Sequence, residues 1–294
     1  MKMNWCQTSA RLPILLSGLL ALKLVFWPPA AFAYIALTTI DVPEHAFSGA
    51  LGINNAGRIV GFYRDTIFAD GHGFMFDRGT FATIDFPSAT RTQASGINDA
   101  GRVVGFYRDA AGVGHGYLLN GVAFTRIDFP GATFTSAYGI NNAGQIVGFY
   151  DDVSGTTHGF RLTGGTFDTI DVPGGVETLC LGINDKGEIV GTYSDASGRH
   201  GFLLAGGTFT TIDVPGAMST DAVGINDAGQ IVGDYRDASA SHGFLLDGGT
   251  FTTIDGPASE LTEASGINAG GGIVGLYEDC RGLGADHGFA TVRW

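Results

Sequence analysis

Six histidines recur in register along the chain, and each opens a His-Gly-Phe or His-Gly-Tyr tripeptide. The aspartate of a Tyr-x-Asp motif precedes each of them by five to eight residues. Imidazole and carboxylate groups at this spacing could ligate a metal, form a catalytic pair or build a hydrogen-bond network. The histidines are His72, His115, His158, His200, His242 and His287, and the aspartates are Asp65, Asp109, Asp152, Asp195, Asp237 and Asp279.

The pattern favours a structural network within each copy. No serine or cysteine recurs beside the pair as a nucleophile, and no Asp-x-Asp-x-Asp-Gly calcium loop is present. On the third strand of a radiating sheet, with strands about 4.8 Å apart, the histidines would lie at least roughly 10 Å from one another, too far to share one zinc ion. We therefore predict that each aspartate orients its histidine, with no catalytic residue, metal or cofactor.

Two further polar positions repeat. The aspartates of an Ile-Asp pair are expected to cap the turn that leaves each copy, and the asparagines of Gly-Ile-Asn are expected at the first turn position, bonded to their own backbone. The Ile-Asp residues are Asp41, Asp85, Asp128, Asp171, Asp213 and Asp255.

The repeat itself predicts the fold. Gly-Ile-Asn begins at Gly52, Gly96, Gly139, Gly182, Gly224 and Gly266, in steps of 44, 43, 43, 42 and 42 residues. In the third copy, 136–141, 145–150, 158–162 and 166–172 are each typical of a strand. The chain opens with a lone fourth strand, 34–42, and closes with the first three strands of a copy. These patterns predict an all-β fold, a six-bladed β-propeller of four-stranded blades over residues 34–294. The N-terminal fourth strand would close the ring by pairing with the C-terminal third strand.

A site used only once should lie where the copies differ. The connections from each fourth strand to the next first strand have equal lengths but different chemistry. Their Glu177, Asp221, Glu260 and Glu263 would form an acidic arc at the channel mouth, and paired carboxylates about 5–10 Å apart are what glycosidases use; ordinary solvated charge is the alternative. The candidate ligand-binding residues are Glu44, His45, Arg91, Phe134, Glu177, Asp221, Glu260 and Glu263.

The N-terminal segment is typical of a secretory signal. Lys2 and Arg11 precede an apolar run, and Ala31-Phe32-Ala33 has the small-x-small form of a cleavage site. We expect residues 1–33 to be removed near Ala33, which leaves an extracellular or periplasmic monomer with no transmembrane segment. Its formal charge would change from −13 to −16, which disfavours nucleic acid and anionic lipid as partners. Cys180 and Cys280 fall in blades that are not neighbours, so no disulfide is expected.

The segments Gly-Ile-Asn-Asn-Ala-Gly-Gln-Ile-Val-Gly and His-Gly-Phe-Leu-Leu-x-Gly-Gly-Thr-Phe resemble the bacterial extracellular HAF repeat over residues 34–294. This chain carries Gly where the repeat's name has Ala. The resemblance implies secretion and a propeller, and it implies no established activity or catalytic residues.

Three functions are compatible with these features. Uniform short connections and near-identical blades favour a non-catalytic secreted binding module for a glycan or another extracellular polymer. An envelope module that binds a protein partner is the first alternative. A glycoside hydrolase or lyase that uses the acidic arc is the second.

Overall fold

The computed structural model describes residues 37–45, 47–66, 71–279 and 286–291, and every regular element in them is a β-strand. The predicted leader with its cleavage site, Cys280 and Trp294 lie outside these residues. No helix within the described ranges is long and apolar enough to cross a membrane.

Each of the first three repeats forms a separate sheet of four sequential antiparallel strands. The strands are β2 (Phe47–Ile53), β3 (Ile59–Arg64), β4 (His72–Asp77) and β5 (Thr80–Ile84); β6 (Arg91–Ile97), β7 (Val103–Arg108), β8 (Gly114–Asn120) and β9 (Ala123–Ile127); and β10 (Phe134–Ile140), β11 (Ile146–Asp151), β12 (Thr157–Thr163) and β13 (Thr166–Ile170).

The remaining strands keep the same antiparallel order but are linked into one twelve-stranded sheet. The links are two single parallel pairs, Arg199 with Ser219 and Ser241 with Leu261. The strands are β14 (Glu177–Ile183), β15 (Ile189–Asp195), β16 (Gly198–Ala205) and β17 (Thr208–Ile212); β18 (Ser219–Ile225), β19 (Ile231–Arg236), β20 (Ser241–Asp247) and β21 (Thr250–Ile254); and β22 (Ser259–Ile267), β23 (Ile273–Asp279) and β24 (Asp286–Thr291).

The two ends of the described chain lie side by side. Strand β1 (Leu37–Thr39) pairs antiparallel with β24, with Leu37 opposite Thr291 and Thr39 opposite Phe289. The amide of Ile40 extends this contact by donating to the carbonyl of Gly288 at 2.7 Å. The N-terminal fourth strand and the C-terminal third strand therefore belong to one sheet.

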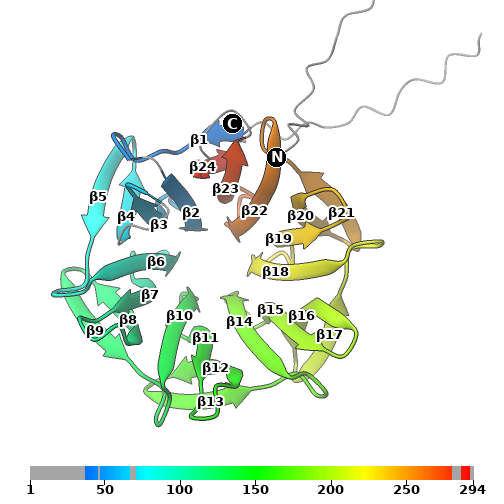
Figure 1. The fold of residues 1–294 in the computed structure, drawn as a ribbon, viewed down its shortest axis with the longest axis horizontal. Coiled ribbons are helices and arrows are strands. Elements are labelled where there is room, and N and C mark those ends of the chain that lie inside the picture. Colours follow the sequence, from blue (N-terminus) through cyan, green and yellow to red (C-terminus); the bar gives the residue numbers. More distant parts are fainter. Residues whose placement is uncertain (1–36, 46, 67–70, 280–285, 292–294) are drawn as a thin grey trace, which may run out of the picture.

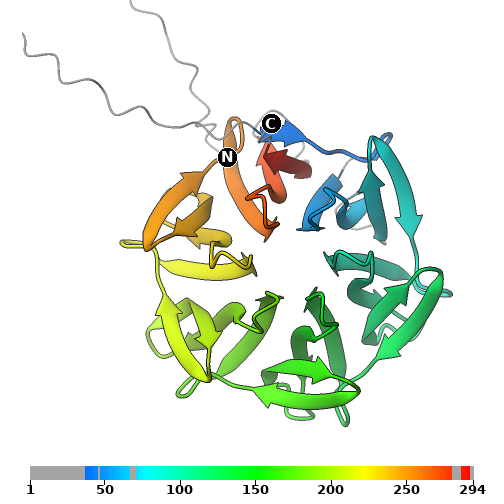
Figure 2. The same ribbon diagram turned by 180° about the vertical axis from the view of Figure 1, so that it is seen from behind.

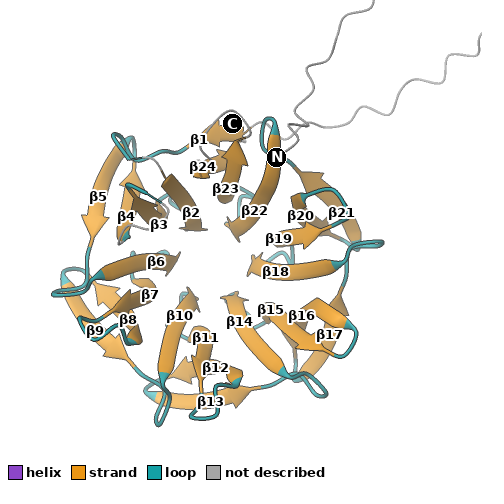
Figure 3. Cartoon of the chain, viewed as in Figure 1, coloured by secondary structure: helices purple, strands orange, loops and turns teal. Residues whose placement is uncertain are grey.

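The sheets radiate from a central axis in a propeller-like arrangement (Figure 1). The first strand of every repeat is innermost and the fourth is outermost, and the view from behind shows the same order (Figure 2). Short loops connect the strands at both ends (Figure 3). We call β2, β6, β10, β14, β18 and β22 the inner strands, because they surround the central channel.

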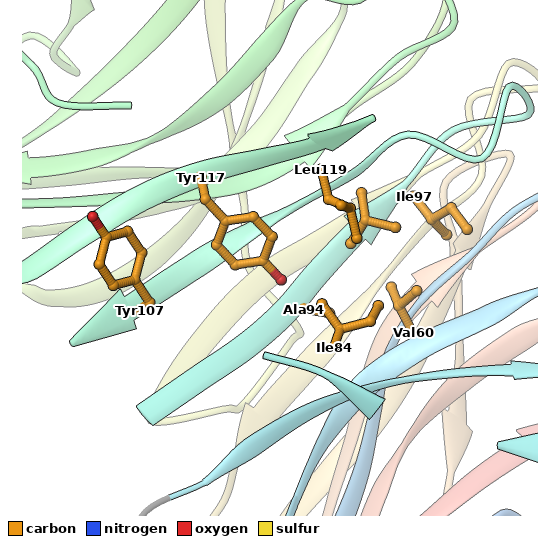
Figure 4. Close-up of a cluster of buried hydrophobic side chains, with 8 residues drawn as sticks. Val60, Ile84, Ala94, Ile97, Tyr107, Tyr117 and Leu119 are labelled. Carbon is orange, nitrogen blue, oxygen red and sulfur yellow. The ribbon is translucent and has the colours of Figure 1, made fainter. Parts of the chain in front are cut away.

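Apolar side chains of adjacent sheets pack together between the blades. In the cluster drawn in Figure 4, Val60 and Ile84 of one sheet contact residues of the next, including the fully buried Tyr117. The aromatic residue of the His-Gly-Phe or His-Gly-Tyr motif is fully buried in every copy, as Phe160 is in the third. Burial of these rings is a main source of stability, at about 25 cal/mol per Å² of apolar surface.

The glycine of Gly-Ile-Asn is required by close approach of neighbouring inner strands. A Cβ atom on Gly96 would lie 2.5 Å from the carbonyl oxygen of Tyr138, and one on Gly266 would lie 2.8 Å from that of Leu51. Any side chain here would push the inner strands apart. The repeated glycine therefore allows the inner strands to approach closely at the end of the channel that carries the Gly-Ile-Asn turns.

Candidate functional site

The asparagines of Gly-Ile-Asn connect neighbouring repeats at one end of the channel. Each Oδ1 atom accepts hydrogen bonds from its own turn, as expected, and Asn54 takes one from the Arg58 amide at 3.0 Å. Each Nδ2 atom also donates to the backbone carbonyl of the corresponding asparagine in the next repeat, at 3.1–3.2 Å. The series runs from Asn54 through to Asn268, which donates to Asn54, so these asparagines connect the blades as well as shape the turns.

A second polar ring covers the first, and its members are more exposed. Asp99 accepts hydrogen bonds from the backbone and side chain of Asn55 and from the side chain of Asn142, at 2.8–2.9 Å. Partial burial opposes the effect of these bonds, yet their sum lowers the pKa of Asp99. These polar groups line a cavity at this end of the channel and hydrogen-bond to one another around it.

The repeated histidines have a different first partner from the one predicted. In every repeat the Nδ1 atom lies 2.7–3.0 Å from the Ile-Asp carboxylate on the neighbouring strand or connection. The Ile-Asp residues were expected only to cap a turn. They contact the histidines because the fourth strand lies beside the third, so the residue that ends it is next to the imidazole.

The Tyr-x-Asp carboxylates are the second and more distant partners. They lie 3.4–3.6 Å from the Nε2 atoms of His115, His158, His200 and His242. Asp65 instead contacts His45 at 2.6 Å, and the side chain of Asp279 is outside the described residues. Within the described ranges no three His, Cys, Asp or Glu side chains are grouped as a metal ion would require. The arrangement orients imidazole rings between carboxylates.

The Tyr-x-Asp residues also shape the turn between the second and third strands. Asp152 Oδ1 accepts from the Ser154 hydroxyl at 2.7 Å, the Ser154 amide at 2.8 Å and the Thr156 amide at 2.9 Å. These bonds, led by the one from the hydroxyl, lower the pKa of Asp152 to about 2. Asp152 therefore stabilises the conformation of this turn.

The predicted ligand-binding residues lie on the inner strands more than on the connections. Arg91, Phe134 and Glu177 begin β6, β10 and β14, while Asp221 and Glu263 lie further along β18 and β22. The expectation of a loop arc was wrong on this point, because these residues belong to the inner strands; β10, for example, begins at Phe134, before the predicted start at 136. The structure brings Glu177, Asp221 and Glu263 to successive inner strands.

The other candidates lie apart from this group. Glu44 is exposed in a turn with a φ of 69°, and His45 packs on Tyr63 with ring centroids 4.4 Å apart. Glu260 is exposed beside a register irregularity at the start of β22. Two members of the predicted set therefore point to solvent.

Phenylalanines gather on the two innermost strands of the first three repeats. Half-buried Phe62, Phe106 and Phe149 occupy one repeated slot on the second strands, and the Phe134 ring lies 6.3 Å from Phe106 and 5.9 Å from Phe149. The guanidinium of Arg64 lies over Phe62 at 5.5 Å and that of Arg91 over Phe106 at 5.2 Å. We call Phe62, Phe106, Phe134 and Phe149 the aromatic wall.

Carboxylates gather on the two innermost strands of the last two repeats. Asp221 and Asp234 are cross-strand neighbours on β18 and β19. Arg199 pairs with Asp221 at 2.7 Å and with Glu177 at 3.6 Å, which leaves Asp234 and Glu263 without a hydrogen bond or ion pair to any described residue. We call Asp221, Asp234 and Glu263 the acidic cluster.

The pKa values of two carboxyl groups in the acidic cluster are raised. Burial raises the pKa of Asp234 well above its usual value, and the charges of Glu263 and Asp221 add to this, against a smaller effect of Arg199. Burial likewise raises the pKa of Glu263, with Asp286 and Asp221 contributing. Both carboxyl groups therefore hold a proton more tightly than exposed ones do.

Tyr138 lines the axial cavity from β10, and Ser265 of β22 lines the same cavity. Tyr138 is the extra residue at a register shift in β10, and Leu51 and Ser95 also line this cavity. Burial raises the pKa of its phenol, and the next contributions come from Glu263, Asp234 and Asp221. A bulge thus aims the tyrosine across the channel.

Asp234, Tyr138 and Arg199 were missed from the sequence. Comparison of the copies could have found Asp234, because its slot holds Phe62, Phe106, Phe149, Thr192 and Leu276 elsewhere. Tyr138 could have been found in the same way, since its slot is otherwise Leu, Ser or Val. All three lie on strands, outside the connections in which a single site was predicted.

Comparison with known proteins identifies an architecture. No family model matches the chain, and no curated protein matches it. Among solved structures, TolB from Acinetobacter baumannii superposes with a TM-score of 0.59 at 13% identity, over 81% of this chain and 64% of TolB. The β-propeller domain of the Trilobed protease from Pyrococcus furiosus superposes with a TM-score of 0.50 at 9% identity, over 85% of this chain and 94% of that domain.

The shared property is the β-propeller fold. A lectin from Aleuria aurantia, in complex with Fucalpha1-6GlcNAc, shares it with a TM-score of 0.51 at 10% identity, over 81% of this chain and 90% of the lectin. The chain spans about two thirds of the length of the TolB it matches. At these identities the likeness concerns the propeller alone.

Proposed function

We propose that this chain is a non-catalytic binding module that recognises a glycan, or another extracellular polymer, at the end of the propeller where the inner strands begin. The observation that carries the proposal is a difference between repeats on their two innermost strands, with the aromatic wall in the first three repeats and the acidic cluster in the last two. Sugar rings present apolar C–H faces and hydroxyl donors, so stacking surfaces and carboxylate acceptors suit them.

The proposal includes the finer architecture and location. Six four-stranded blades would form a monomeric ring closed by β1, which the antiparallel pairing of β1 with β24 supports. Membership of the HAF repeat family and export after removal of residues 1–33 rest on the sequence patterns. The acidic balance argues against nucleic acid as a partner.

Fold comparison supports the proposal only in general terms. The lectin from Aleuria aurantia was solved in complex with Fucalpha1-6GlcNAc, so a propeller of this kind can present a glycan site. The envelope partner module remains the alternative that a lack of glycan binding would favour.

A glycan and polysaccharide array with residues 34–294, with and without calcium, tests the proposal. We expect specific retention, and we expect Phe149→Leu to weaken binding about fivefold because it removes a stacking face worth about 1 kcal/mol. Phe251→Leu, on the outermost strand β21, is the matched control and should bind as the parent does. A blank array in both conditions would exclude the glycan proposal and favour a protein partner.

A glycoside hydrolase is the second candidate. Glu263, with its raised pKa, could donate a proton while the Arg199-paired Asp221 acts as a base or nucleophile. Turnover of a glycan retained on the array, lost in Asp221→Asn, Glu177→Gln and Glu263→Gln at unchanged folding, would establish the enzyme. Retention without turnover would establish the binding module.

A further inference from the structure

We propose that a cavity between the second and third repeats is the binding pocket for the terminal sugar of the glycan, and that this sugar carries no charge. The inference rests on the proposed glycan-binding function and names its class of ligand, because the cavity lies at the same end of the propeller, beside the start of β10. Its volume is about 310 Å³, at the small end of the range of about 300–1,000 Å³ for ligand pockets, which suits one sugar ring.

The cavity lies where two neighbouring strands remain apart. At equivalent junctions Arg199 pairs with Ser219 and Ser241 pairs with Leu261, which joins β16 to β18 and β20 to β22. Among the described strands no such pair joins β8 to β10, and these two strands belong to separate sheets. The side chains at this junction therefore border a space instead of a continuous sheet.

Gly114 and Phe134 contribute an apolar surface to the cavity. A Cβ atom on Gly114 would lie 2.3 Å from the Cε2 atom of Phe134, so the ring rests directly on the glycine backbone. Four of the other repeats have a side chain in the slot of Gly114, and these residues are Thr157, Arg199, Ser241 and Asp286. Phe129 and Val113 extend the apolar lining, against which the C–H face of a sugar can pack.

A buried imidazole fixes the polar part of the cavity. The His115 side chain is only 6% exposed, its Nδ1 atom lies 2.9 Å from Asp128, and its Nε2 atom lies 3.4 Å from Asp109. Carboxylates occupy both ring nitrogens, so His115 acts on a ligand only by holding Asp128 in one orientation. The Asp128 carboxylate itself lines the cavity and is partly exposed there.

Arg126 distinguishes this repeat from the others. In the other five repeats its slot is a threonine whose hydroxyl hydrogen-bonds to the tyrosine of Tyr-x-Asp at 2.9–3.2 Å; the threonines are Thr39, Thr83, Thr169, Thr211 and Thr253. Arg126 instead donates from Nε to Asp128, and its side chain is 53% exposed at the cavity. A guanidinium has five N–H donors, so its terminal nitrogens can donate to a ligand.

The pair of Arg126 and Asp128 presents donors and acceptors side by side, as a sugar hydroxyl requires. A carboxylate has about four lone-pair sites, and His115 and Arg126 use one on each oxygen of Asp128. A ligand hydroxyl can therefore accept from Arg126 and donate to Asp128. Because a ligand carboxylate would be repelled by Asp128 and a ligand ammonium by Arg126, an uncharged sugar fits best.

Phe134 connects the cavity with the aromatic wall. Its ring lines the cavity, and the centroid of the same ring lies 5.9 Å from that of Phe149. A glycan whose terminal sugar fills the cavity would therefore place its following residues over the aromatic wall. The cavity would select the end of the chain, and the wall would bind the rest.

Nuclear magnetic resonance titration with the methyl glycosides of glucose, galactose and mannose tests the inference. Each is compared with its hexuronate and with its 6-amino-6-deoxy counterpart, so that only the charge at one position changes. We expect at least one neutral glycoside to bind about tenfold more tightly than both charged forms, with one site per chain. Its addition should shift the amide resonances of Gly114 and Gly131, which border the cavity.

Arg126→Thr is the decisive variant, because it introduces the residue that the other five repeats carry. We expect it to stay folded and to bind the neutral glycoside about tenfold more weakly, since a charged hydrogen-bond donor is lost. Lys186→Ala is the matched control, because it also removes one positive charge and introduces the alanine that four other repeats carry. Lys186 lies in the turn after β14, at the other end of the channel, so this variant should bind as the parent does. Circular dichroism confirms that both variants are folded.

Three results would overturn the inference while leaving the proposed function intact. These are unchanged binding in Arg126→Thr, equal or tighter binding of a hexuronate or an amine, and no binding of any of these glycosides although the array retains longer glycans. A blank array would instead remove the proposed function itself.

Discussion

Asp234 places a carboxylate in a slot that is apolar or hydroxyl-bearing in the other repeats. Its neighbours Gly233 and Tyr235 keep the pattern of the repeat, so the strand β19 forms as in other copies. Ionisation of Asp234 is unfavourable at this position, because burial and two nearby carboxylates raise its pKa. A repeat can therefore accept one unfavourable charge without a change of fold.

We predict that Asp234→Asn alters the pH dependence of stability. The folded pKa lies above the unfolded value of 3.8, so the contribution of Asp234 to the free energy of unfolding is fully present below that value and is lost as the pH rises through the folded pKa. The neutral variant lacks this loss. Urea denaturation from pH 3 to 8 should show the variant gaining on the parent as the pH rises, by about 1.4 kcal/mol per unit of raised pKa.

Asp237→Asn is the control of opposite sign. Hydrogen bonds led by that from the Ser239 hydroxyl lower the pKa of Asp237 to about 2, so its contribution is present above the unfolded pKa and is lost as the pH falls. This variant should lose stability relative to the parent as the pH rises from 2 to 5. A stability difference between Asp234→Asn and the parent that is independent of pH would contradict the prediction.

A hydroxyl clasp fastens each fourth strand to the next inner strand. The backbone amide one position after the Ile-Asp aspartate donates to a serine or threonine hydroxyl six residues later, at 2.9–3.1 Å. The accepting residues are Ser48, Thr92, Thr135, Thr178, Thr220 and Thr262, and all are buried. The clasp therefore ties the end of each fourth strand to the next inner strand.

We predict that Thr178→Val destabilises the protein by about 1–3 kcal/mol, because the amide of Val172 would be buried without an acceptor. Thr178→Ser should cost less, since it keeps the hydroxyl and the first repeat uses Ser48 at this position. Chemical denaturation of both variants measures the difference. Equal stability of the two variants would show that the clasp contributes nothing.

The contacts that join the blades form a series around the axis. The asparagine side chains link each inner strand to the next, and Asn268 donates to Asn54. On the outside, β1 is the fourth strand beside β22–β24. The Asp41 Oδ2 atom lies 2.9 Å from the Nδ1 atom of His287. Contacts between residues more than 200 positions apart therefore hold the two ends together.

We predict that a chain starting at residue 43 is much less stable than one starting at residue 34. Loss of β1 would expose the edge of β24 and remove the packing of Leu37, Ile40 and Val42, worth about 3 kcal/mol or more. Thermal unfolding should show a lower midpoint, and light scattering should show association through the open edge. An unchanged midpoint and a monomer would show that β1 is dispensable.

The sequence by itself determined the repeat, its strands and its turns. Alternating β-branched and aromatic residues, the Asn-x-x-Gly turns and the lone strand at the N-terminus depend on local chemistry, which short segments contain. The turn glycine of the third repeat, Gly144, has the expected positive φ of 82° and donates to the carbonyl of Asn141. Burial at the His-Gly-Phe motif follows from the same alternation.

Only the tertiary structure decided which of the differing residues meet. Tyr138 and Ser265 are 127 positions apart and line one axial cavity because their inner strands surround it. The histidines turned to the Ile-Asp carboxylates because the third and fourth strands are adjacent. Distances across the axis depend on how the blades pack, and local sequence preference carries no information about that packing.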